Sequence, residues 1–140
     1  TALAGDGVHI TGRVADIIPY YERCTVCMVP LRAGGGTRLK ILEAMALGRP
    51  VVSTTLGCEG LDVVPGEHLL VADDADGLAD AAIALLSDAT RRDRVVERAR
   101  RLVEQRHDWD AIAERMLQVY AEVVAAPVGP VVQAGIGSGQ

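Results

Sequence analysis

The stretch GGGTRLKILEAMALGRPVV, residues 34–52, decides the fold of this chain. Its three consecutive glycines predict a loop that can adopt positive φ and bring its backbone close to a ligand. The apolar residues that follow recur at helical spacing and predict a helix over residues 37–47, which Gly48 and Pro50 end. A strand is then predicted over residues 51–54 because two valines open it. A loop, a helix and a buried strand therefore follow one another directly.

The residues on either side continue this alternation. Further strands are predicted over residues 8–11, 25–29 and 68–72, and a helix capped by Asp16 runs to Arg23 between the first two. Alternating strands and helices predict right-handed parallel crossovers, so the fold class is α/β with a parallel sheet flanked by helices. Four strands are few for a free-standing sheet of this kind, so we expect the chain to be part of a longer polypeptide.

The second half of the chain is predicted to be helical. From residue 73 the apolar period becomes 3.6 and predicts three helices, with Asp88 capping the second and Asp108 the third. Residues 127–140 carry no charge and much Gly, Pro and Val, which predicts a disordered tail or linker. We therefore predict one folded unit over residues 1–126, with residues 127–140 outside it.

Composition restricts the classes of function. The chain has 140 residues and a formal net charge of −5, the wrong sign for a protein that holds nucleic acid through its phosphates. No apolar run is long enough to predict a membrane span, and the first residues do not read as a secretory signal. We therefore expect a cytoplasmic protein with no nucleic-acid partner.

The cysteines and histidines predict no metal site. Cys24 and Cys27 form a C-x-x-C, but they lie in or next to a predicted strand, where residues i and i+3 face opposite sides. We interpret them, with Cys58, as small buried residues in a reducing compartment. The three histidines, at positions 9, 68 and 107, have no partner at the spacing of a metal site or a catalytic triad.

Three loops qualify as a ligand site because ligands of open α/β sheets bind beyond the carboxyl ends of the strands. They span residues 12–14, 31–36 and 55–60. The middle loop leads into a helix whose free N–H groups and dipole favour an anion, and Thr37, Arg38 and Lys40 add a hydroxyl and two positive charges. A phosphate-bearing ligand is one interpretation of this loop, and a simple glycine turn is the other.

Glu43 supports the first interpretation. It lies three residues after Lys40, so both side chains reach the same face of the helix one turn apart. A carboxylate offers only acceptors and can take both hydroxyls of a ribose diol. A position for an anion at the start of the helix and a position for a diol one turn further along match the diphosphate and the ribose of a nucleoside diphosphate. The alternative is an ordinary surface ion pair between Lys40 and Glu43.

With these residues in place, the stretch 34–52 resembles the donor-binding lobe of GT-B-fold glycosyltransferases of family 4, the glycosyl transferases group 1. The core LEAMA, followed by G-x-P-V-V, is specific, and the resemblance covers about residues 8–125. The flanking segments agree with it: TGRV at 11–14, GCEGL at 57–61 and WD at 109–110.

The resemblance implies a Rossmann-like sheet that forms a truncated C-terminal half of a GT-B fold, with C-terminal helices. It also implies a retaining, metal-independent hexosyl transfer from a nucleotide-diphosphate sugar in glycan biosynthesis, with no cofactor. Glu43 corresponds to the second Glu of the family's E-x₇-E motif, which binds ribose. The backbone of Arg13 and Val14 would meet the base. The amides of Gly36, Thr37, Arg38 and Leu39 would meet the donor sugar and diphosphate, with Lys40 beside them.

The sequence also departs from the family pattern. The first Glu of the motif, which contacts the transferred sugar, falls at Gly35. The family's upstream Arg and Lys, and the N-terminal acceptor lobe that would be a partner, lie outside this chain, so we expect it to be inactive alone. The alternatives are a non-catalytic nucleotide-binding module and a fragment of a GT-B-like sugar-nucleotide epimerase.

An arginine-rich segment gives one further hypothesis. Six arginines between residues 91 and 101 could contact anionic lipid at the inner face of a membrane, as in a peripheral enzyme. Interleaved acidic residues favour a solvated helix face instead. The sugar, the base and the acceptor do not follow from the sequence.

Overall fold

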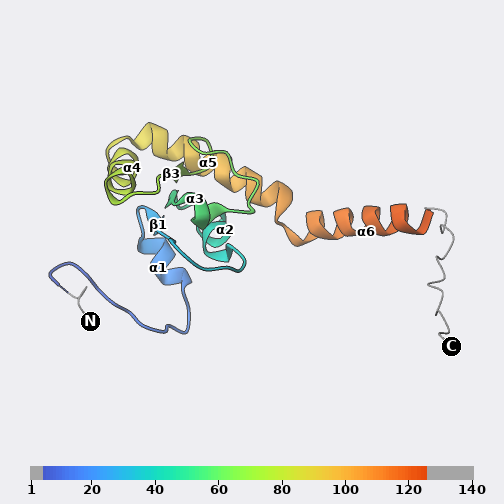
Figure 1. Ribbon diagram of the computed structural model, residues 1–140, viewed down its shortest axis with the longest axis horizontal. Coiled ribbons are helices and arrows are strands. Elements are labelled where there is room, and N and C mark those ends of the chain that lie inside the picture. The colour runs from blue at the N-terminus through green and yellow to red at the C-terminus, as the bar shows by residue number, and fades with distance from the viewer. Residues whose placement is uncertain (1–4, 126–140) are drawn as a thin grey trace, which may run out of the picture.

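Residues 5–125 are described by a computed structural model of the chain, which contains a three-stranded parallel sheet in the order β1-β2-β3 (Figure 1). The strands are β1 (Cys27–Val29), β2 (Val51–Ser53) and β3 (Leu70–Val71). Met28 pairs with Val52, and Val52 pairs with Leu70 in turn. The predicted α/β fold with a parallel sheet is confirmed.

Helices connect and cover the strands, and α2 fills the crossover between β1 and β2. Helix α5 begins where the sequence predicts, since the Asp88 carboxylate accepts the Arg91 N–H at 2.8 Å. Asp74, which was not predicted as a cap, accepts the Gly77 N–H at 2.8 Å at the start of α4. The six helices of residues 5–125 are α1 (Ile18–Arg23), α2 (Leu39–Ala46), α3 (Thr55–Cys58), α4 (Ala75–Ser87), α5 (Ala89–Arg106) and α6 (Trp109–Ala125).

The strand predicted over residues 8–11 is wrong. These residues form no regular element, and Val8 and Ile10 are 51% and 55% exposed. A strand needs a neighbour for its backbone hydrogen bonds, and no partner strand lies beside this segment in the part of the chain that the structure describes. The described sheet therefore has three strands where four were predicted.

Smaller differences concern the ends of elements. Helix α2 begins at Leu39 rather than at Thr37, and it ends before Gly48, whose φ of 67° favours glycine. The predicted loop after β2 contains the short helix α3. The predicted tail, residues 127–140, lies outside the described residues.

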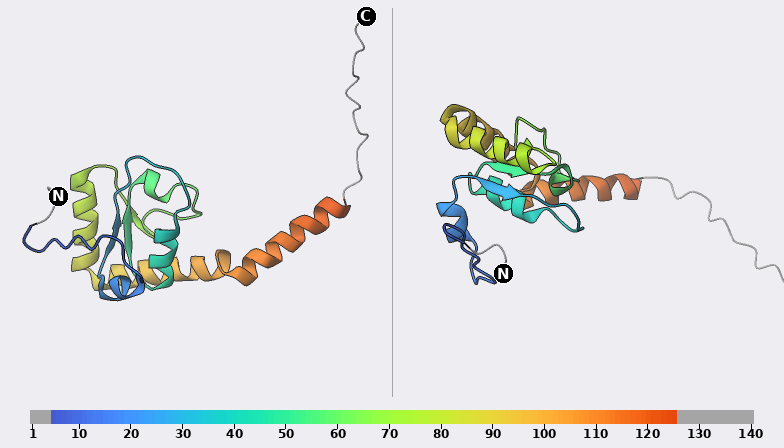
Figure 2. Two further views of the ribbon diagram at one scale, coloured as in Figure 1. Left: turned by 90° about the horizontal axis from the view of Figure 1, so that it is seen from below. Right: turned by 60° about the vertical axis from the view of Figure 1, so that its left-hand side comes forward.

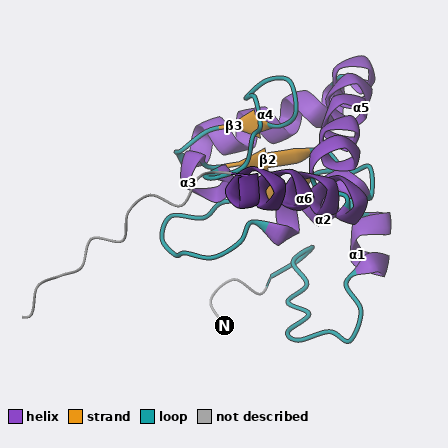
Figure 3. Ribbon diagram, turned by 90° about the vertical axis from the view of Figure 1, so that its right-hand side faces the viewer, coloured by secondary structure: helices purple, strands orange, loops and turns teal. Residues whose placement is uncertain are grey.

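The core consists of two apolar clusters, one on each face of the sheet. Val51 and Leu69 pack on the face covered by α2, whereas Val52 and Leu70 pack on the face covered by α4. Helix α5 contributes to both clusters, and Figures 2 and 3 show the strands enclosed by these helices. This packing fixes α2 and the loop before it relative to the sheet.

Helix α6 lies outside this core. It extends away from the sheet in Figures 1 and 2, and none of its residues is buried. Its predicted apolar stripe is therefore largely exposed, as are Trp109 and Val124. No helix within residues 5–125 combines the length and the apolar character that crossing a bilayer requires.

Candidate functional site

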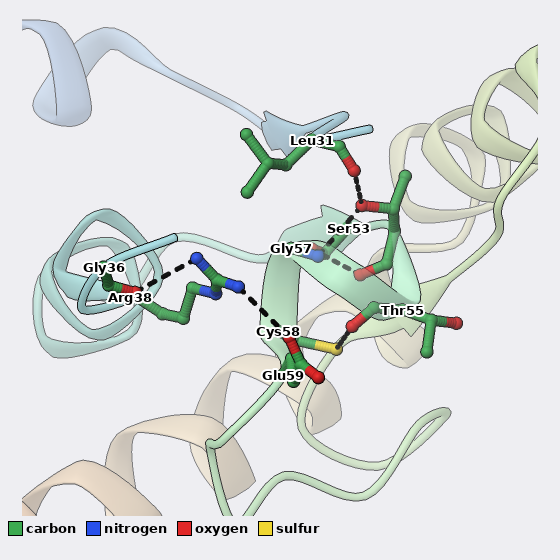
Figure 4. Close-up of polar contacts among 9 residues, drawn as sticks. Leu31, Gly36, Arg38, Ser53, Thr55, Gly57, Cys58 and Glu59 are labelled. Atoms are coloured by element: carbon green, nitrogen blue, oxygen red, sulfur yellow. Dashed lines mark hydrogen bonds and ion pairs between the residues drawn. The ribbon is translucent and has the colours of Figure 1, made fainter. Parts of the chain in front are cut away.

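The candidate site lies at the edge of the sheet where the parallel strands end. Strand β1 leads into residues 30–38, β2 into α3, and β3 into Asp73. Hydrogen bonds connect the first two segments, because the Thr54 hydroxyl donates to the Leu31 carbonyl at 2.6 Å and accepts the Gly57 N–H at 3.0 Å (Figure 4). Two of the three predicted loops thus meet at one edge of the sheet.

The third predicted loop, residues 12–14, does not follow a strand. Arg13 is exposed and Val14 is half-buried. In the described part of the chain, no hydrogen bond or ion pair joins either residue to the glycine loop. Their predicted contact with the base stays a prediction.

The glycine loop has the conformation that its sequence predicts. Gly34 and Gly36 have φ of 125° and 101°, which side chains rarely adopt, and the loop residues 32–37 are exposed. Gly35 differs from both, because its φ is not positive and a Cβ atom added there would meet nothing within 4 Å. The lack of a carboxylate at position 35 is therefore not imposed by space or by backbone conformation.

Arg38 is bound to the loop rather than free. Its Nη1 donates to the Gly36 carbonyl at 3.0 Å, and its Nη2 lies 3.5 Å from the Glu59 carboxylate (Figure 4). Only 10% of its side chain is exposed, and its buried Nε has no hydrogen-bond partner among the described residues. In this structure Arg38 stabilises the glycine loop, and the exposed cation at the start of α2 is Lys40.

Glu43 lies one turn further along α2, with its carboxylate exposed. The Tyr21 hydroxyl is 3.4 Å from Glu43 Oε2 and 3.1 Å from the Lys40 carbonyl oxygen. Lys40 and Glu43 are not among the ion pairs of residues 5–125, so the surface ion pair weighed above is not formed. Leu39, Lys40 and Glu43 are all exposed next to the glycine loop.

Four residues that contribute to this edge were missed in the sequence. Thr54 and Ser53 are buried polar residues that fasten α3 to β1, and Ser53 Oγ lies 3.3 Å from the Val29 carbonyl oxygen. Tyr21 comes from α1, twenty-two residues before Glu43. Asp73 follows β3. Polar residues directly after an apolar strand were the signal that could have identified Thr54 and Asp73.

Asp73 holds the first residue of α3 through hydrogen bonds. Its carboxylate accepts the Thr55 N–H and the Thr55 hydroxyl, each at 2.8 Å. These hydrogen bonds lower the pKa of Asp73 below its ordinary value of 3.8. A carboxyl group whose pKa is lower in the folded than in the unfolded chain stabilises the fold when it is ionised. Its contribution to the free energy of unfolding is complete above the unfolded-state pKa, and it is lost as the pH falls through the folded-state pKa.

We therefore expect Asp73→Asn to be less stable than the parent at pH 7, and the difference to shrink as the pH falls below 3.8. Urea denaturation at pH 7 and pH 3 measures it. Asp80→Asn is the matched control, since Asp80 is exposed and forms no hydrogen bond or ion pair among the described side chains. A pH-independent difference would contradict the role of the Asp73 carboxylate.

The cysteines are free thiols, and Cys58 is buried as predicted. Cys24 and Cys27 are half-buried, and only Cys27 lies within a strand. Burial raises the pKa of Cys27 and of Cys58, so both are protonated near neutral pH. Residues 5–125 contain no group of three or more His, Cys, Asp or Glu side chains placed to hold a metal ion.

The arginine-rich segment lies on α5 and is largely paired. The pairing favours a solvated helix face over a lipid-binding patch, because a neighbouring carboxylate neutralises the charge of each paired arginine. Membrane contact stays a prediction. The ion pairs are Arg92–Asp93, Arg98–Glu67, Arg100–Glu104 and Arg101–Glu97.

The chain is similar to known proteins across most of its described length. A family model described as glycosyl transferases group 1 matches residues 1–88. Phosphatidyl-myo-inositol mannosyltransferase of Mycobacterium leprae is 35% identical over 103 residues, which are 72% of this chain and 27% of that protein. A GDP-mannose-dependent monoacylated alpha-(1-6)-phosphatidylinositol monomannoside mannosyltransferase of Corynebacterium glutamicum is 31% identical over 121 residues, 80% of this chain and 32% of the relative.

A solved structure gives the same result for the fold. Sucrose-phosphate synthase from Thermosynechococcus elongatus matches with a TM-score of 0.72 and 33% identity, over 88% of this chain and 32% of that one. The chain therefore spans between a quarter and a third of the length of these proteins.

Proposed function

Because this chain belongs to the glycosyl transferases group 1 family, we propose that the edge formed by the glycine loop and α2 binds a nucleotide-diphosphate sugar, the donor in a glycosyl transfer. One observation carries the proposal. An exposed glycine loop leads into α2, whose first two turns present an exposed lysine and an exposed carboxylate that do not pair with each other. A phosphate and a ribose diol would satisfy these two groups separately.

The diphosphate would lie at the N-terminus of α2. The first N–H groups of a helix have no partner within it, and the helix dipole favours an anion there. The amides of residues 36–39 and the ammonium group of Lys40 would supply the donors. Arg38 would contribute indirectly, because its contacts with Gly36 and Glu59 hold the loop in place.

The nucleoside would lie along α2. Glu43 would accept the two ribose hydroxyls through its carboxylate oxygens, which together offer about four lone-pair sites. The backbone of Arg13 and Val14 would approach the base, and the backbone at Gly35 and Gly36 would approach the sugar. GDP is the first nucleotide to test, since one relative is named as GDP-mannose-dependent.

This site would contribute leaving-group stabilisation to catalysis. Negative charge develops on the diphosphate as its bond to the sugar breaks, and fixed N–H groups with Lys40 stabilise that charge. Retention of anomeric configuration and independence from metal ions are proposed from the resemblance to the family. The acceptor would be held by segments that this chain does not contain.

A second candidate is a nucleotide-binding module without transferase activity. It is favoured by Gly35, which supplies no side chain to contact the transferred sugar although a side chain would fit there. Both candidates require nucleotide binding, and they differ in whether the complete protein transfers a sugar. A transfer assay on the complete protein separates them.

The experiment is an NMR titration of this chain with GDP and UDP, with and without EDTA. We expect a dissociation constant of about 0.1–1 mM, or roughly −4 to −5.5 kcal/mol, because Lys40 is the exposed cation at the helix start. Shifts should concentrate at residues 34–43 and be the same in EDTA. Binding that strictly requires Mg²⁺, or shifts confined to α5 and α6, would overturn the proposal.

A further inference from the structure

Helix α1 is held on the body of the protein by one side chain. Tyr21 is the buried residue of this six-residue helix, and its ring belongs to the apolar cluster that also contains Ile41 and Met45 of α2. Its hydroxyl group emerges from this cluster beside α2, within 3.1 Å of the Lys40 carbonyl oxygen and 3.4 Å of Glu43 Oε2. The ring of Tyr21 packs in the core, whereas its hydroxyl reaches the candidate ligand site.

The Tyr21 hydroxyl can donate one hydrogen bond, and it has two acceptors within reach. The Lys40 carbonyl lies inside α2 and accepts the backbone N–H four residues later in any regular helix. The Glu43 carboxylate is charged and is the stronger acceptor. The pKa of Tyr21 is raised to about 12, mainly because the hydroxyl is buried and further because Cys27 and Glu43 lie nearby. The phenol therefore keeps its proton at neutral pH.

We infer that Tyr21 is a positioning residue, which orients the Glu43 carboxylate toward the ribose of the bound nucleotide. The inference rests on the proposed function, because it assigns to Tyr21 a role in the ribose site itself. An exposed glutamate on a helix samples several rotamers, and fixing it on binding costs conformational entropy. The Tyr21 hydroxyl holds one carboxylate oxygen in advance and leaves the other oxygen, with further lone pairs, for the two ribose hydroxyls.

The chain supplies a matched control in the preceding residue. Tyr20 lies on the same helix, but this residue is 45% exposed and no hydrogen bond from its hydroxyl is found among the described residues. Tyr21→Phe removes only the hydroxyl and keeps the buried ring, and Tyr20→Phe makes the same chemical change away from Glu43. An effect that comes from removing any phenol hydroxyl from α1 should therefore appear in both variants, whereas an effect through Glu43 should appear only in Tyr21→Phe.

Affinities are measured by NMR titration with GDP, 2′,3′-dideoxy-GDP and inorganic pyrophosphate. We expect Tyr21→Phe to weaken GDP binding about three- to fivefold and to leave the other two ligands unchanged, because only GDP presents the diol. Tyr20→Phe should match the parent for all three ligands. In the Glu43→Gln background, Tyr21→Phe should have no further effect on GDP, because the two side chains act together.

The same titrations distinguish failure of this inference from failure of the proposed function. If Glu43→Gln abolishes the preference for GDP over dideoxy-GDP and Tyr21→Phe does not reduce it, the positioning role is overturned and the ribose site stands. If neither variant changes the preference, both are overturned. Equal weakening of all three ligands by Tyr21→Phe would assign Tyr21 a purely structural role.

A second measurement needs no variant at position 21. Spectrophotometric titration of the tyrosines in Glu43→Gln should show the most basic phenol shifted to a lower pKa than in the parent, since the Glu43 carboxylate contributes to the raised pKa of Tyr21. An unchanged titration curve would show that the hydroxyl and the carboxylate do not interact in solution, and would overturn the inference.

Discussion

Glu43→Gln should weaken the binding of GDP to this chain about tenfold or more, while inorganic pyrophosphate binds as before. In the proposed site the carboxylate accepts two ribose hydroxyls, and these charge-assisted hydrogen bonds are together worth about 1.5–3 kcal/mol. Glutamine keeps the size and helix propensity of the side chain but replaces one acceptor with a donor. Glu43 is exposed, so the free energy of unfolding should change by less than about 0.5 kcal/mol.

Lys40→Met is the complementary variant, because Lys40 would contact the phosphates and not the ribose. It should weaken GDP and pyrophosphate alike. Isothermal titration or NMR with both ligands separates the two patterns, and urea denaturation checks that each variant is folded. If Glu43→Gln unfolds the chain, or leaves GDP binding untouched, then Glu43 serves only as the partner of Tyr21 and the ribose role is wrong.

Gly57→Ala should destabilise the fold by about 2–4 kcal/mol, a large effect for the addition of one methyl group. A Cβ atom at this position would lie 2.3 Å from Ser53 Oγ, 2.9 Å from the Val29 carbonyl oxygen and 3.0 Å from Thr54 Oγ1. Ser53 and Thr54 are buried and hydrogen-bonded, so they cannot move aside without leaving polar atoms unpaired. The variant must either shift α3 or break these bonds.

Urea denaturation of the parent and the variant measures this difference. Gly35→Ala is the matched control, because a Cβ atom there meets nothing within 4 Å and φ is not positive. Its stability should stay within about 0.5 kcal/mol of the parent. If Gly57→Ala is as stable as Gly35→Ala, the connection between β2 and α3 is not the rigid joint that the structure describes.

The local parts of the fold could be predicted from the sequence because their signals are local. Helix α2 was found from its apolar period and from the left-handed Gly48 that follows it, and α5 from its period and the cap at Asp88. Strands β1 and β2 were found as apolar runs, although each is shorter in the structure than predicted. In each case the residues that determine the element lie within it or next to it.

The features that could not be predicted depend on contacts between distant segments. The segment 8–11 has the composition of a strand, but pairing requires a neighbour that the sequence cannot reveal. Arg38 was predicted to add a positive charge beside the anion site, and its contact with Glu59 depends on how two loops fold together. The approach of Tyr21 to Glu43 likewise follows from the packing of α1 on α2.

Helix α6 has a consequence for how this chain unfolds. None of its residues is buried, so its loss would expose little additional apolar surface, whereas α1 to α5 share the two clusters around the sheet. Most of the stability of a helix in a protein comes from the packing of its apolar face, and α6 buries no residue. We therefore expect the cooperative folding unit of the described chain to end near Arg106. The amide protons of α6 should then exchange with solvent through the helix–coil equilibrium of α6 itself, independently of global unfolding.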